Sequence, residues 1–166
     1  LEGYLWDPEE PRAAMRAAID VARGAGRKVA FTLSDVFCIS RHGDDFRRLI
    51  AEGQVDILFA NENELLALAE TEDFKAAVSG VAAQVPTLVV TRSEHGALAV
   101  QGGERVEVPA EPVAKVVDTT GAGDLFAAGF LQAQAEGRPL RDSLRLGALC
   151  AAEVISHFGA RPQVDL

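Results

Sequence analysis

The sequence contains little cysteine, little positive charge and no long apolar run. Cys38 and Cys150 are its only cysteines, and they form neither a disulfide pattern nor a metal-like spacing. No uninterrupted apolar run reaches the length of a membrane span. Lys and Arg number 16 against 25 Asp and Glu, which gives a formal charge of −9. These shortages exclude a disulfide scaffold and a membrane-spanning helix. They also argue against general affinity for nucleic acid or an anionic membrane.

The remaining composition is that of a folded protein. Hydrophobic residues make up 48% and charged residues 25% of 166 residues, close to the average for a globular domain. This length is that of one ordinary domain. Because the two cysteines form no disulfide pattern, we expect a protein of the reducing cytoplasm. The chain opens with Leu1 instead of Met and lacks a signal-peptide pattern. Because residues 1–6 read like a strand, we also expect the chain to be a fragment.

Short β-like runs alternate with longer helical runs along the chain. Strands are predicted at 29–33, 55–59 and 87–91, and helices at 8–25, 44–52, 61–68, 74–83, 124–136 and 140–157. An antiparallel hairpin is predicted near 97–108, around Gly102 and Gly103. The pattern predicts an α/β fold, a three-layer sandwich in which helices flank a mainly parallel sheet. In such sheets ligands bind at the carboxyl ends of the strands.

One segment stands out, Asp118-Thr119-Thr120-Gly121-Ala122-Gly123-Asp124. Its small residues let backbone N–H groups converge where a helix begins, which favours binding of an anion such as phosphate. Asp124 falls in the first turn of that helix, where it could accept a proton from an attacking hydroxyl. The alternative is a plain turn followed by a helix acid.

The whole string resembles the second signature of the ribokinase family, the PfkB carbohydrate kinases. The resemblance implies that Asp124 is the catalytic base and that Gly121, Ala122 and Gly123 form the anion hole. Some members hold a monovalent cation with the first Asp and a Thr of this signature. Asp118 and Thr120 are therefore candidates for binding K⁺, and a role of Asp118 as a cap of the loop stays an equal alternative.

Two further elements match this family in the expected order. Asn61 and Glu64 match its Asn-x-x-Glu element, which helps to hold Mg²⁺ near the nucleotide, partly through water. The alternative is a helix N-cap with its capping-box partner, and the two roles are compatible. Thr91, Ser93 and Gly96 resemble the Thr-x-Gly-x-x-Gly nucleotide loop, with Ser93 in place of the usual glycine.

The segments 3–5, 31–37 and 55–62 resemble the adenosine kinase branch. The turn 159–162 resembles the closing turn of the family, which follows a helix that lines the adenine pocket. The resemblance covers only the C-terminal half of the family pattern. It implies that residues 1–166 are the nucleotide-binding half of a ribokinase-like domain, with the N-terminal half and the lid absent. The implied cofactors are ATP and Mg²⁺, and the implied activity is phosphoryl transfer to a hydroxymethyl group of a nucleoside.

Adenosine is the first acceptor that this resemblance implies. The alternatives are a sugar kinase acting on ribose, fructose or a related sugar, and a nucleotide-binding fragment without activity of its own. We expect the 166 residues alone to be inactive and to have a small-molecule nucleoside or sugar as partner. An unpaired strand edge near residues 1–5 further predicts self-association. Phe31, Phe37, Phe59 and Phe130 are expected to pack on the sheet, and Cys150 in the core.

Overall fold

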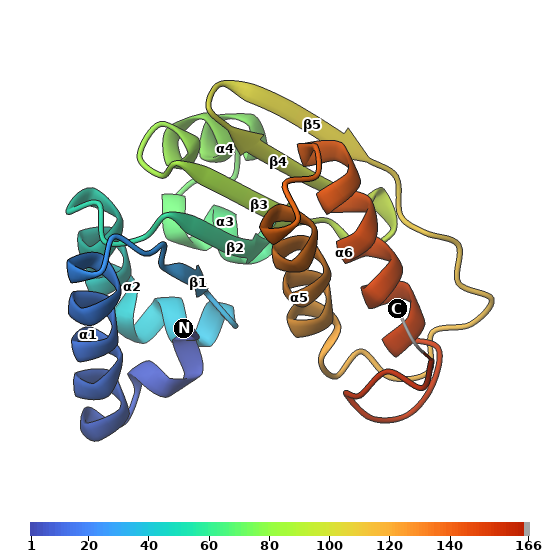
Figure 1. Ribbon diagram of the computed structural model, residues 1–166, viewed down its shortest axis with the longest axis horizontal. Helices are drawn as coiled ribbons and strands as arrows, with labels where there is room; N and C mark the ends of the chain where they lie inside the picture. Colours follow the sequence, from blue (N-terminus) through green and yellow to red (C-terminus); the bar gives the residue numbers. More distant parts are fainter. Residues whose placement is uncertain (165–166) are drawn as a thin grey trace. The chain divides into compact units, whose positions relative to one another are not determined.

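The computed structural model describes residues 1–164, which form a five-stranded sheet with helices. The strands lie in the order β1 (Ala30–Thr32), β2 (Ile57–Asn61), β3 (Thr87–Thr91), β4 (Ala97–Gln101) and β5 (Glu104–Val108) (Figure 1). The chain divides into two compact units. Unit 1 consists of residues 1–90 and 100–103, and unit 2 of residues 91–99 with those from 104 onward.

The sheet is mixed. β1 and β2 pair in parallel, with Ala30 opposite Ile57 and Thr32 opposite Phe59. The connections at 92–96 and 102–103 are too short for a parallel crossover. β4 therefore runs antiparallel to β3, and β5 runs antiparallel to β4. The predicted α/β class and the hairpin near 97–108 are therefore confirmed.

Unit 1 has an aromatic core. Trp6, Phe31 and Phe46 meet edge to face, with ring centroids 5.0 to 6.0 Å apart, and all three are almost completely buried. The Trp6 indole N–H donates to Asp45 at 3.1 Å, so its polar atom is satisfied. The helices of this unit are η1 (Gly3–Trp6), α1 (Glu9–Gly24), α2 (Val36–Ala51), α3 (Glu62–Ala69) and α4 (Phe74–Ala82).

The start of the chain differs from the prediction. Only Glu2 pairs with a strand, as a parallel bridge to Thr32, and the 3₁₀ helix η1 follows at once. The chain leaves the sheet because the Gly3 N–H donates to the Ser34 hydroxyl at 2.9 Å. Gly3 lies so close to the Leu33 carbonyl that a Cβ would collide with it.

Helix α2 begins well before the predicted 44–52. The carboxylate of Asp35 accepts the Phe37 N–H at 2.7 Å and caps the helix there. The expectation that Phe37 packs on the sheet is wrong. Its side chain is 56% exposed and lies 5.3 Å from the Arg41 guanidinium. Phe31, Phe59 and Phe130 are buried as expected.

Unit 2 contains η2 (Ser93–His95) and the helices α5 (Ala122–Ala135) and α6 (Leu140–Val154), which lie side by side (Figure 1). The helices approach closely at Gly129, where a Cβ would come within 2.7 Å of the Cys150 sulfur. Cys150 is buried, as predicted. None of the helices in residues 1–164 is long and apolar enough to cross a membrane.

Candidate functional site

The loop that enters α5 presents backbone donors. Gly121 is the N-cap residue, with φ +79°, a conformation that glycine adopts at little cost. The Ala122 N–H donates to the Thr119 carbonyl at 3.2 Å. The N–H groups of Gly123 and Asp124 have no acceptor in the described part of the chain. They lie at the positive end of the helix dipole and are available to an anion.

Asp124 is exposed in the first turn of the same helix. Its carboxylate has no hydrogen-bond or ion-pair partner among residues 1–164. A solvent-facing carboxylate without a partner, next to two available N–H groups, is able to accept a proton from a group bound there.

Asp118 caps the loop. Its Oδ1 accepts the Thr120 N–H at 2.9 Å and the Thr120 hydroxyl at 2.7 Å, and its Oδ2 accepts the Gly159 N–H at 3.0 Å. These hydrogen bonds, above all those from Thr120, lower the pKa of Asp118 to about 2. K⁺ binding by Asp118 and Thr120 stays a prediction. Within the described residues no group of three or more His, Cys, Asp or Glu side chains is placed to hold a metal.

A C-terminal loop, residues 157–163, packs behind the anion-binding turn. A Cβ added to Gly121 would come within 2.6 Å of the Ala160 Cβ. The loop is also held by Glu153, whose Oε1 lies 2.8 Å from the Gln163 N and 3.1 Å from the His157 Nε2. The sequence reasoning missed Glu153. Its only local signal is the four-residue spacing to His157.

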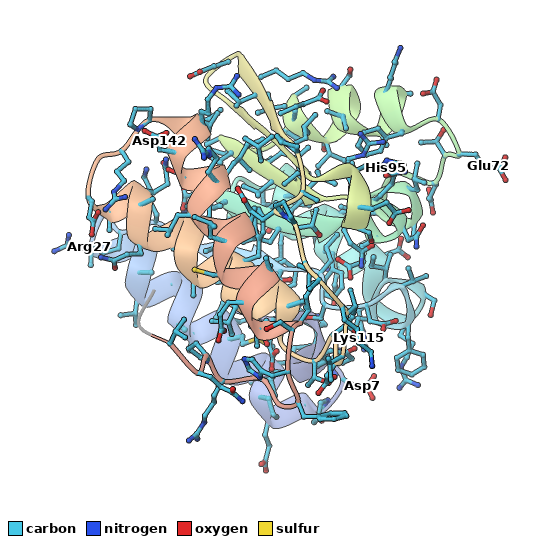
Figure 2. All side chains as sticks on the ribbon, turned by 90° about the vertical axis from the view of Figure 1, so that its right-hand side faces the viewer. Asp7, Arg27, Glu72, His95, Lys115 and Asp142 are labelled. Atoms are coloured by element: carbon cyan, nitrogen blue, oxygen red, sulfur yellow. The ribbon has the colours of Figure 1, made fainter. Side chains whose placement is uncertain are left out.

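A groove of about 500 Å³ lies beside this loop, within unit 2. Segment 111–114 forms one wall, and Leu146, Leu149, Ala152, Glu153 and Ser156 form the other. Figure 2 labels Lys115, which follows the first wall in the chain. The volume and the mainly apolar lining are in the range of small-molecule sites.

The candidate residues Thr91, Ser93 and Gly96 lie at the end of β3 and in the loop that follows it, where Figure 2 labels His95. Ser93 has φ +50°, so it keeps a left-handed conformation where the family has glycine. Gly96 has φ +84°, and a Cβ on it would collide with the Val108 carbonyl. Only glycine fits at position 96.

In unit 1, Asn61 and Glu64 form a complete capping box at the start of α3. Asn61 Oδ1 accepts the Glu64 N–H at 2.8 Å, and Glu64 Oε2 accepts the Asn61 N–H at 2.9 Å. The Asn61 amide also donates to Glu64 Oε1 at 2.6 Å. Burial raises the pKa of Glu64, with Asp35 adding to the shift and the Asn61 backbone opposing it.

The capping alternative is thus present in the structure, and it uses both Glu64 carboxylate oxygens and the Asn61 amide oxygen. Mg²⁺ binding by these two residues stays a prediction. Carboxylate and amide oxygens are the preferred ligands of Mg²⁺, and a Mg²⁺ ion that keeps several waters needs only one or two protein groups.

Solved structures and curated relatives resemble this chain. Adenosine kinase from Sinorhizobium meliloti is 50% identical with a TM-score of 0.95, over 98% of this chain and 50% of that one. Cytidine kinase of Thermococcus kodakarensis is 42% identical over 111 residues, 64% of this chain and 39% of its own length. The chain therefore spans about half of the solved relative and less of the curated one.

A more distant structure shares the fold. A putative ribokinase II from E. coli, solved in complex with ATP and Mg²⁺, is 23% identical with a TM-score of 0.85, over 96% of this chain and 52% of that one. The family model for pfkB family carbohydrate kinases matches residues 1–165. This match spans nearly the whole chain, which thus belongs to the pfkB family of carbohydrate kinases.

Proposed function

We propose that this chain is the nucleotide-binding half of an ATP-dependent kinase that phosphorylates a hydroxymethyl group of a nucleoside, with adenosine as the first acceptor. The observation that carries the proposal is the N-terminus of α5, where the unpartnered carboxylate of Asp124 stands beside the available N–H groups of Gly123 and Asp124. The 50% identity to an adenosine kinase supports the choice of acceptor.

The chemistry follows from these groups. Asp124 accepts the proton of the attacking hydroxyl, so that its oxygen becomes a better nucleophile. The available backbone N–H groups of Gly123 and Asp124, set by the turn at Gly121, hold the oxygens of the transferring phosphoryl group and stabilise the charge that they carry. The Ala122 N–H, expected to belong to the anion hole, instead donates to the Thr119 carbonyl. The groove along α6 takes the base of ATP. Asp118 and Thr120 shape the turn, and K⁺ would bind at their oxygens.

In unit 1, Asn61 and Glu64 would hold Mg²⁺ through water, while the capping box keeps both side chains in place. Bound Mg²⁺ neutralises part of the phosphate charge. The loop of Thr91, Ser93 and Gly96 would contact the nucleotide. The structure of ribokinase II with ATP and Mg²⁺ supports these cofactors.

Calorimetry tests nucleotide binding directly. The 166-residue chain is titrated with ATP in the presence of Mg²⁺, and heat of binding is expected. Absence of heat above background would leave the chain without a nucleotide function. A coupled ADP-release assay across nucleosides and sugars should show no transfer by the chain alone.

The catalytic role of Asp124 needs a protein with an acceptor-binding half. A chimera in which this chain replaces the matching half of the S. meliloti adenosine kinase supplies one. Asp124→Asn should lower its rate by about 100-fold or more, the usual contribution of a general base. Asp142→Asn, at an exposed acid in the first turn of α6, is the matched control. A rate within tenfold of the parent would show that Asp124 is not the base.

The chimera does not identify the natural acceptor, because its acceptor half comes from another protein. That identification needs the same panel, with adenosine, cytidine, ribose and fructose, on this protein extended to the length of its relatives. Transfer to a sugar but to no nucleoside would favour the sugar kinase alternative.

A further inference from the structure

Loop 157–163 is held by two carboxylates from different parts of unit 2. Asp118, which precedes the anion-binding turn, accepts the Gly159 N–H at 3.0 Å. Glu153, in the last turn of α6, accepts the Gln163 N–H at 2.8 Å and contacts His157 at 3.1 Å. Hydrogen bonds to a charged acceptor are the stronger kind, so they fix the loop near both of its ends.

The fixed loop supports the turn that presents the donors. Ala160 lies between the two tethered amides and packs directly against Gly121, where there is no space for even one methyl group. Gly121 in turn sets the direction of the Gly123 and Asp124 N–H groups, because it is the N-cap of α5. A displacement of Ala160 would therefore let the anion-binding turn relax.

The glutamate at position 153 is not explained by a contribution to the stability of the fold. Its Oε2 is buried without any hydrogen-bond partner in the described part of the chain. A buried carboxylate oxygen without a donor destabilises a fold. The same side chain lines the groove along α6. Glu153 thus joins the groove to the loop behind the anion-binding turn.

We propose that Glu153 is a positioning residue of the nucleotide site: by holding loop 157–163 against Gly121, it sets the anion-binding turn before the phosphates arrive. This role rests on the proposed function, since it assumes that the groove and the turn bind one nucleotide. Glu153 itself touches no phosphate in this proposal and acts through Gln163, Ala160 and Gly121.

The test separates the two parts of the site with two probes on the 166-residue chain. Mg²⁺ with inorganic tripolyphosphate probes the phosphate contacts without the groove, and adenosine probes the groove without the phosphate contacts. Glu153→Ala removes the tether, whereas Glu153→Gln keeps one oxygen that accepts the Gln163 N–H. Gln163→Pro removes only the donated N–H and leaves the groove wall intact. Glu104→Ala, at an exposed glutamate of β5, is the control.

Binding of Mg²⁺–ATP to the wild-type chain is measured first. If the wild-type chain does not bind, the proposed function itself is refuted, and the positioning role falls with it. Where wild type binds, Glu153→Ala and Gln163→Pro should weaken tripolyphosphate binding by about tenfold, as expected for loss of a charge-assisted hydrogen bond. Glu153→Gln should recover most of the affinity, and Gln163→Pro should leave adenosine binding unchanged. Amide exchange at Gly159 and Gln163 should quicken in Glu153→Ala.

Tripolyphosphate affinity within twofold of wild type in both tether variants would overturn the proposal. Loss of adenosine binding alone in Glu153→Ala would overturn it too, because Glu153 would then contact the base and not position the turn. If Glu153 served only stability, its substitution would lower the melting temperature without weakening tripolyphosphate binding more than adenosine binding. Binding is measured well below the melting temperature, so that each variant is compared in its folded state.

Discussion

Gly121 and Ala160 are in contact although they are distant in the sequence, and a Cβ on Gly121 would lie 2.6 Å from that of Ala160. Gly121→Ala should therefore destabilise the protein, by about 1–2 kcal/mol for the left-handed conformation alone and by more from the collision. It should also abolish calorimetric binding of Mg²⁺–ATP. Thermal and urea unfolding measure the first effect.

Gly123→Ala is the matched comparison for folding. An added Cβ at Gly123 meets no atom within 4 Å, and the residue lies in the first turn of α5. Its unfolding free energy should stay unchanged or rise by up to ~1 kcal/mol, because alanine favours the helix. Equal stability of the two variants would show that Gly121 is under no constraint from loop 157–163.

The lowered pKa of Asp118 predicts that the stability of the protein depends on pH. This pKa is about 2 in the folded chain against 3.8 for the free group, because Thr120 and Gly159 donate to the carboxylate. A lowered pKa means that the unfolded chain binds the proton more readily. The stabilisation is therefore complete above pH 3.8 and is lost as the pH falls through about 2.

Asp118→Asn isolates this effect from those of the other carboxyl groups. The amide cannot accept from both Thr120 and Gly159, so the variant should be less stable than wild type at pH 6. The difference should shrink toward pH 2. Urea unfolding at several pH values measures it, and a difference that does not change with pH would refute the assignment.

The sequence predicts an element of this fold well where neighbouring residues alone determine that element. The strand Thr87–Thr91 was predicted with the bounds that the structure shows, because a continuous apolar run marks a buried strand. Helix α2 was predicted too short. Val36 and Phe37 at its start are exposed apolar residues, so the first turn does not read as amphipathic. The start depends on the Asp35 cap, and the Asp35 carboxylate also accepts from the Tyr4 hydroxyl at 3.2 Å.

The candidate site shows the same limit. Residues 118–124 were found because they form one contiguous string. The turn 159–162 was recognised only by its resemblance to a closing turn. Its link to residues 118–124 and the role of Glu153 were missed, because the hydrogen bonds from Gly159 and Gln163 use backbone N–H groups, which any residue except proline provides. Such contacts leave no residue-type pattern in the sequence. The left-handed Ser93 is similar, since its backbone takes the glycine-like form without a glycine.

The capping box in unit 1 gives a prediction that separates stability from metal binding. Asn61→Ala should lose about 1 kcal/mol of unfolding free energy, because the Glu64 N–H loses its acceptor. Asn61→Ser restores an N-cap oxygen but not the amide. If Asn61 also helps to hold Mg²⁺, the serine variant should regain stability and still bind Mg²⁺–ATP weakly. Asn63→Ala, at an exposed site in the same turn, is the control. Recovery of both properties in Asn61→Ser would limit Asn61 to the capping role.

The exposed surface of unit 1 gives the last prediction, self-association. β1 is an edge strand, and only the first residues of the chain pair along it, with the Leu1 carbonyl accepting the Thr32 N–H at 3.1 Å. Leu5 and Phe37 in the same unit are 45% and 56% exposed. The Leu1 amino group also donates to the Ala30 carbonyl, so the edge of β1 is covered and the exposed apolar side chains are the feature that favours association between copies. Sedimentation velocity should show a mass that rises with concentration.

A charge on the apolar surface tests where such association occurs. Leu5→Lys combined with Phe37→Lys should return the chain to a monomer, because joining two copies would then require desolvating the ammonium groups. Val21→Lys is the control, since Val21 is an apolar residue on α1 that is 73% exposed. If it dissociates the protein equally well, the contact does not involve Leu5 and Phe37. A monomer at every wild-type concentration would refute self-association itself.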